Sequence, residues 1–188
     1  LNHRILLSAT SIIALAAGAA LPTTPAIAVP TLDVCAAAAP GDTVTIGPDA
    51  GAYPAGIVCS VQDITLVLQG DSDAPAIINT TTNTGLSVPL SGLDGPVTLN
   101  AEAGSSIATS GVSLNGVQIG TAVGPVSINM AGDVATGGDY SVGILVTSDT
   151  GAVDVDVSGS VSTAGIESHA ISTYASQGNT DITLLGSV

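Results

Sequence analysis

A long-period repeat is the feature of this sequence that most limits how the chain can fold. Hydrophobic residues recur at Ile107, Val134, Val161 and Val188, so the residue number rises by 27 each time. Further columns keep the same interval, among them Thr109, Thr136, Thr163; Gly111, Gly138, Gly165; and Gly132, Gly159, Gly186. A fixed period shared by many columns indicates a repeat architecture in which one structural unit stacks on the next.

The repeat is less regular toward the N-terminus. Residues 95–97 (GPV) match residues 124–126 (GPV) at a spacing of 29, and residues 63–66 (DITL) reappear as residues 181–184 (DITL). Loops on a repetitive fold absorb insertions of a few residues at a small entropic cost, so a variable interval is compatible with a single architecture. We therefore expect β-helix repeats over residues 63–188.

Within one unit the pattern alternates with a period of two. Residues 126–130 (VSINM) and 153–157 (VDVDV) alternate apolar and polar side chains, which is typical of a half-buried strand and incompatible with an amphipathic helix. About three such strands fit in each unit, separated by Gly, Asp, Asn and Pro. This pattern predicts an all-β fold, a right-handed parallel β-helix (solenoid) with about 27 residues per coil, in which each strand pairs with its counterpart about 4.8 Å away.

The composition favours this fold over an antiparallel sandwich. Phe and Trp are absent and Tyr occurs three times, which suits a narrow interior filled by stacked Val, Ile and Leu. A sandwich also uses short strands, but it does not require columns of identical residues at a constant interval. We expect the repeated glycines to occupy corners that need a positive φ. The column of Thr109, Thr136 and Thr163 shares parity with the hydrophobic column, so we expect it inside the coil or at a corner.

The N-terminal segment 1–28 has the pattern of a secretory signal peptide. A weakly positive start contains Arg4, an apolar run covers residues 5–20, and residues 26–28 (AIA) have small residues at the positions where signal peptidase requires them. The run is shorter than the roughly 20 residues that span a bilayer, so a membrane-spanning helix is the weaker interpretation. We expect residues 1–28 to be removed on export.

Residues 29–62 differ from the repeats and are expected to form an N-terminal cap and first coil. A solenoid needs an atypical first coil to cover its open hydrophobic end. Cys35 and Cys59 are the only cysteines, and in an exported protein we expect them to form a structural disulfide. At the other end, residues 186–188 (GSV) match residues 159–161 (GSV), so we expect a fragment of a longer polypeptide, truncated at the C-terminus.

The charge of the chain is strongly one-sided. Asp and Glu number 15 against a single Lys or Arg, which is Arg4, for a formal net charge of −14. Such a surface repels phosphate backbones and anionic lipid headgroups. Nucleic acids and membrane surfaces are therefore poor partners.

Three features together resemble an autotransporter (type V secretion) passenger domain. They are the signal peptide, segment 40–53 (PGDTVTIGPDAGAY), and the units 132–144 (GDVATGGDYSVGI) and 159–171 (GSVSTAGIESHAI). The likeness is to the large Gly/Ala/Val/Thr-rich passengers of alphaproteobacteria, and segment 40–53 is also similar to the first coil of pectate-lyase-like β-helices. The resemblance implies a β-helix that an outer-membrane β-barrel translocator, in the same full-length polypeptide, carries to the surface.

The sequence offers no catalytic or cofactor-binding residues. Lyases and hydrolases that share the resembled fold use Lys, Arg or His, and after the expected cleavage only His169 is available. Glu167 and Ser168 precede it, but adjacent residues on an extended chain point to opposite sides and cannot form a triad. We therefore expect a surface or turn histidine.

The acidic residues of segment 153–157 give the remaining candidates for chemistry. Asp154 and Asp156 are expected on the solvated outer face, with Asp181 one coil away from Asp154. A two-carboxylate hydrolase is chemically possible with such a pair. A weak calcium candidate is formed by Asp154 and Asp181, and no other metal site is expected.

These observations favour a structural or adhesive stalk without catalytic activity. We expect the chain to be secreted or displayed at the cell surface or outer membrane, with a host surface or extracellular-matrix molecule as its partner. One alternative is a β-helix hydrolase acting on polysaccharide, whose catalytic residues lie in the missing C-terminal part. A second is an ice-binding solenoid, which would need the threonine column to face outward.

Overall fold

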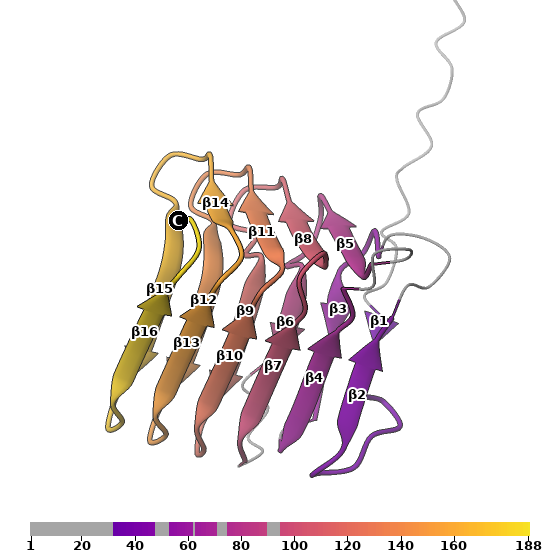
Figure 1. Cartoon of the computed structure of the whole chain (residues 1–188), viewed down its shortest axis with the longest axis vertical. Helices are drawn as coiled ribbons and strands as arrows, with labels where there is room; N and C mark the ends of the chain where they lie inside the picture. Colours follow the sequence, from indigo (N-terminus) through magenta and orange to yellow (C-terminus); the bar gives the residue numbers. More distant parts are fainter. Residues whose placement is uncertain (1–31, 48–52, 62, 71–74, 90–94) are drawn as a thin grey trace, which may run out of the picture.

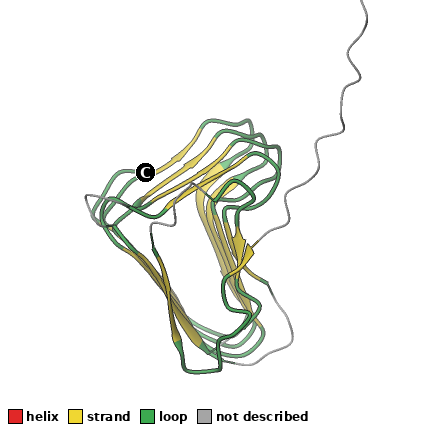
Figure 2. Cartoon of the chain, turned by 90° about the vertical axis from the view of Figure 1, so that its right-hand side faces the viewer, coloured by secondary structure: helices red, strands yellow, loops and turns green. Residues whose placement is uncertain are grey.

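The computed structural model describes residues 32–47, 53–61, 63–70, 75–89 and 95–188. These residues form sixteen strands and no helix (Figure 2). The strands lie in three all-parallel sheets, which wind into a β-solenoid of about 5 turns with about 27 residues per turn. The predicted all-β parallel solenoid is confirmed. The predicted signal peptide, residues 1–28, lies outside the described residues, and within those residues no helix is long and apolar enough to cross a membrane.

The strands of each sheet follow one another along the solenoid axis (Figure 1). Sheet A consists of β1 (Leu32–Asp33), β3 (Ile57–Val58), β6 (Leu86–Val88), β9 (Val117–Thr121), β12 (Val142–Ser148) and β15 (His169–Ala175). Sheet B consists of β2 (Thr43–Ile46), β4 (Ile64–Leu68), β7 (Val97–Ala101), β10 (Val126–Met130), β13 (Val153–Val157) and β16 (Thr180–Leu184). Sheet C consists of β5 (Ile77–Thr80), β8 (Ser106–Thr109), β11 (Asp133–Thr136) and β14 (Val161–Thr163).

The strand register in sheet B follows the spacing of the repeat. Val126 pairs with Val153, and Val153 pairs with Thr180, so both pairings keep the period of the sequence columns. Between β7 and β10 the partners are Val97 and Val126, a longer offset that agrees with the spacing of the GPV segments. The insertions that lengthen earlier units therefore lie between strands.

One sequence match is out of register. The two DITL segments start at residues 63 and 181, but Leu66 lies in the column that continues through Leu99, Ile128 and Val155 to Ile182. The second segment is therefore displaced by two positions from the first. Because strand side chains alternate with a period of two, this displacement keeps the inward and outward faces unchanged.

The core is a set of stacked aliphatic columns. In sheet B, Leu66, Leu99, Ile128 and Val155 occupy successive coils, and each is at most 1% exposed. In sheet C the corresponding column is Ile78, Ile107, Val134 and Val161. Burying such a side chain contributes about 1.5–3 kcal/mol, so each coil depends on its neighbours to cover its apolar side chains.

The threonine column lies inside the solenoid. Thr109 and Thr136 are 4% and 3% exposed, and Thr80, which the sequence pattern did not reveal, extends the column by one coil. Thr163 is half-buried in the same register. The expectation of an interior position is confirmed for Thr109 and Thr136, and the column does not offer the outward ladder that ice binding would need.

The prediction that the repeated glycines occupy positive-φ corners is wrong for most of them. Among the recurring glycines only Gly124 has a positive φ, of 132°. The others are required by close packing between coils: a Cβ on Gly138 would lie 1.9 Å from the carbonyl oxygen of Gly111, and one on Gly151 would lie 1.8 Å from that of Gly124. The left-handed corner position recurs instead at Ser113, Tyr140 and Glu167, with φ of 57°, 56° and 53°.

The N-terminal coil is fastened by a disulfide. Cys35, after β1, is joined to Cys59, after β3, with their Cα atoms 4.9 Å apart. Both cysteines are at most 1% exposed. The bond thus links the first coil to the second, within the segment predicted to be the cap.

Candidate functional site

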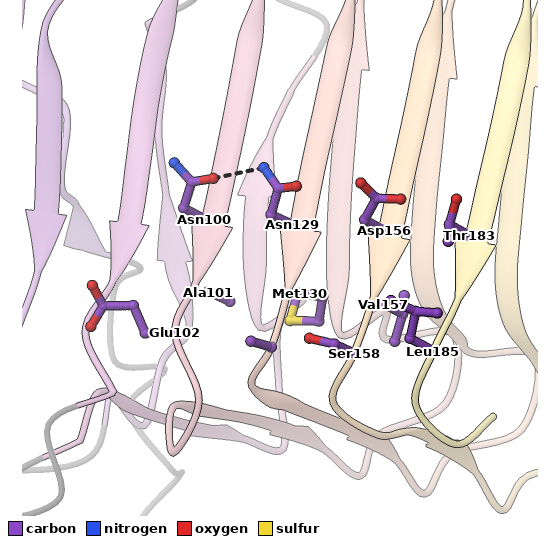
Figure 3. Close-up of a pocket in the computed structure, with 11 residues that line it drawn as sticks. Asn100, Ala101, Glu102, Asn129, Met130, Asp156, Val157, Ser158, Thr183 and Leu185 are labelled. Carbon is purple, nitrogen blue, oxygen red and sulfur yellow. Dashed lines mark hydrogen bonds between the residues drawn. The ribbon is translucent and has the colours of Figure 1, made fainter.

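An open groove lies on the outer surface where sheet B ends and the chain turns toward sheet C (Figure 3). Its volume is about 620 Å³. Strands β7, β10, β13 and β16 supply its walls, because the parallel register brings the same position of each strand to the same edge. The groove therefore runs along the solenoid axis across several coils.

The first wall of the groove is an outward row of polar side chains. Side chains alternate between inward and outward along each strand, and one outward position of β7, β10, β13 and β16 faces the groove. The residues at this position are Asn100, Asn129, Asp156 and Thr183. Figure 3 shows these side chains projecting from the same face of successive strands. We call this set the polar row.

The second wall consists of the residues just after the strands. Each donates its backbone N–H to the preceding coil: Ala131 to Ala101, Ser158 to Met130, and Leu185 to Val157, at 2.8–2.9 Å. Glu102 holds the same position at the end of β7. We call Glu102, Ala131, Ser158 and Leu185 the corner row; its two middle members are small, and they leave room beside the polar row.

Hydrogen bonding within the polar row is directional. Asn129 Nδ2 donates to Asn100 Oδ1 at 2.8 Å, so the carbonyl oxygen of Asn129 is turned toward Asp156 (Figure 3). The Asp156 carboxylate has no hydrogen-bond partner among the described residues. Two acceptors on neighbouring strands therefore face a common space, and no donor of the described chain is hydrogen bonded to the Asp156 carboxylate, although the Thr183 hydroxyl lies on the strand beside it.

The corner carboxylate has a structural contact. Glu102 Oε2 accepts a hydrogen bond from the backbone N–H of Gly70 at 3.0 Å. This contact fixes one oxygen of Glu102 against the previous coil. Asp156 is therefore the carboxylate of the groove that is free to meet a ligand.

The acidic residues named from the sequence occupy the same face. Asp154 and Asp156 both point outward from β13, and Asp154 lies directly opposite Asp181 on β16. Asp156 lines the groove, whereas neither Asp154 nor Asp181 does. Nowhere in the described ranges do three or more His, Cys, Asp or Glu side chains gather to hold a metal ion, so the calcium candidate has two carboxylates and no third ligand of this kind.

The histidine lies away from the groove. His169 is the exposed first residue of β15 in sheet A, and its backbone N–H donates to the carbonyl of Ser141. The Ser168 hydroxyl donates to the carbonyl of Gly138 at 2.9 Å, and Glu167 has a left-handed backbone. Ser168 thus supports the turn between sheets C and A, and His169 is the surface histidine that the sequence predicted.

The asparagines of the polar row were missed by sequence reasoning. Asn100 and Asn129 have the same spacing in the sequence as the two GPV segments. That spacing could have aligned them, but an outward amide does not indicate a groove until the corner that follows it is known.

No family model, curated protein or solved structure matches this chain.

Proposed function

We propose that this chain is a structural or adhesive β-helix stalk, exported and displayed at the cell surface as part of an autotransporter passenger, and without catalytic activity of its own. The observation that carries the proposal is the parallel solenoid, in which the strands of one coil pair with their counterparts in the next. Such a rod lengthens by about 4.8 Å with each added coil and needs no redesign of its core. The proposed partner in secretion is a β-barrel translocator in the same full-length polypeptide.

Two further features support the proposal. The disulfide between Cys35 and Cys59 suits an oxidising compartment outside the cytosol. Residues 32–188 contain neither Lys nor Arg, so the rod carries only negative side-chain charge apart from His169. This charge keeps copies of the rod apart from one another and from anionic lipid.

Export is tested by expressing the full chain in a Gram-negative host and analysing its compartments. We expect the protein outside the cytoplasm with a new N-terminus at Val29, measured by mass spectrometry of the intact chain. A chain that stays in the cytoplasm with residues 1–28 attached would contradict the proposal. A matched variant with Ile13→Asp in the apolar run should remain cytoplasmic.

Display is tested at the gene. Sequencing the locus beyond the codon for Val188 should reveal further repeats followed by an outer-membrane barrel. If the reading frame instead continues into a catalytic domain without a barrel, the stalk proposal is wrong and the hypothesis of a polysaccharide-acting hydrolase takes its place.

A further inference from the structure

The groove described above presents hydrogen-bond acceptors that no donor of the described chain satisfies. Asn129 directs its carbonyl toward Asp156, and the Asp156 carboxylate is unpaired within the described chain. Neighbouring strands of a sheet are about 4.8 Å apart, so one group with several N–H donors can contact both acceptors at once. The ligand that fits this space is a donor and carries positive charge.

The chain cannot supply that positive charge from its described part. No Lys or Arg lies between residues 32 and 188, and the formal net charge of the whole chain is −14. Once residues 1–28 with Arg4 are removed, as the proposed export requires, a cation that neutralises Asp156 must come from another molecule. The surrounding negative field would also speed the approach of such a molecule.

The corner row adds an apolar component to the groove. Leu185 and Ala131 both line the groove, and Ala131 is small enough to leave the space beside it open. A purely inorganic cation gains nothing from these side chains. A cationic group attached to a planar or aliphatic side chain packs that side chain against them while its charge pairs with the Asp156 carboxylate.

We propose that the groove binds an arginine side chain from an extended, basic segment of a partner protein. The guanidinium is planar and presents five N–H donors, so it pairs with the Asp156 carboxylate through two parallel hydrogen bonds and still reaches the carbonyl of Asn129. Its weakly hydrated faces and methylene stem pack against Ala131 and Leu185. The groove runs across several coils, so an extended segment lies along it. The inference deepens the proposed adhesive role, on which it rests, by naming the partner's chemistry.

The test uses the purified full chain and a fluorescent six-residue arginine peptide, with binding followed by anisotropy at low salt. We expect Asp156→Asn to weaken binding by about fivefold or more, because the carboxylate is the charged partner of the guanidinium. Asp149→Asn is the matched control: it removes the same charge from an exposed turn between β12 and β13 and should weaken binding by less than about twofold.

Two further measurements separate the groove from general charge attraction. Ser158→Trp fills the middle of the corner row without changing the net charge, and it should weaken binding as much as Asp156→Asn. A six-residue lysine peptide should bind about threefold or more weakly, because an ammonium lacks the planar fork. Equal losses in the Asp156 and Asp149 variants, or unchanged binding in Ser158→Trp, would overturn the inference. This assay needs only purified protein, so its result is independent of the export and display experiments. A negative binding result would overturn the arginine inference without affecting the proposed function, and failed export would overturn the proposed function without affecting the binding result.

Discussion

Thr109 and Thr136 lie opposite each other on β8 and β11, one coil apart, but only the hydroxyl of Thr109 is hydrogen bonded. Thr109 Oγ1 donates to the carbonyl oxygen of Leu114 at 3.1 Å. Thr136 Oγ1 is buried and finds no partner in the described chain. The same residue in the same register therefore makes opposite contributions to stability in neighbouring coils.

Replacing each threonine by valine should expose this difference. Thr136→Val removes an unsatisfied buried hydroxyl while keeping its shape, so the free energy of unfolding should stay the same or rise by up to about 1 kcal/mol. Thr109→Val leaves the Leu114 carbonyl without its donor and should lower that free energy by about 1 kcal/mol. Urea unfolding followed by circular dichroism measures both variants. Equal losses in the two would show that the hydroxyl of Thr136 is satisfied.

Adjacent glycines in the turn after β11 provide a second contrast. A Cβ on Gly138 would meet the carbonyl oxygen of Gly111 at 1.9 Å, whereas one on Gly137 has its nearest neighbour, the carbonyl oxygen of Thr109, at 3.7 Å. Gly138→Ala should therefore force adjacent coils apart and cost about 1–3 kcal/mol. Gly137→Ala should change stability by less than about 1 kcal/mol. Thermal unfolding of the two variants checks the prediction, and similar midpoints would contradict it.

Loss of the disulfide should weaken the N-terminal end of the solenoid. The sequence separation of Cys35 and Cys59 is 24, and closing such a loop stabilises the fold by about 3.5 kcal/mol on a chain-entropy argument. Cys35→Ser with Cys59→Ser should reduce stability by about that amount. Hydrogen exchange should report faster opening of β1 and β3, with β12 and β13 unchanged, because coils contact only their neighbours. Uniform acceleration along the whole chain would argue against a local role for the bond.

The facing pair Asp154 and Asp181 should be mildly destabilising. Like charges directly opposite on neighbouring strands repel each other. Asp154→Asn should raise the free energy of unfolding by about 0.2–1 kcal/mol at low ionic strength, and added NaCl should remove most of this gain by screening. The same samples test the calcium candidate. If millimolar CaCl₂ stabilises the unaltered chain far more than MgCl₂ and loses this effect in Asp154→Asn, a calcium site is present.

The sequence alone determined the architecture. Columns such as Ile107, Val134 and Val161 at a constant interval require stacked equivalent positions, and the alternation in residues 153–157 requires strands. Both signals arise from the periodicity of the chain, which is local and needs no knowledge of distant contacts. The sequence also predicted the interior position of Thr109, because Thr109 is two residues from the inward Ile107 and strand side chains alternate with a period of two.

Only the tertiary structure decided what depends on contact between coils. Gly138 and Gly151 look like turn residues in the sequence, but the carbonyl oxygens of the preceding coil are what exclude a side chain there. The turn itself places Tyr140 in the left-handed conformation, which no sequence rule favours for that residue. The meeting of Asn129 with Asp156 at one groove likewise depends on register and on the bend after the strand, because outward side chains become neighbours only when coils stack.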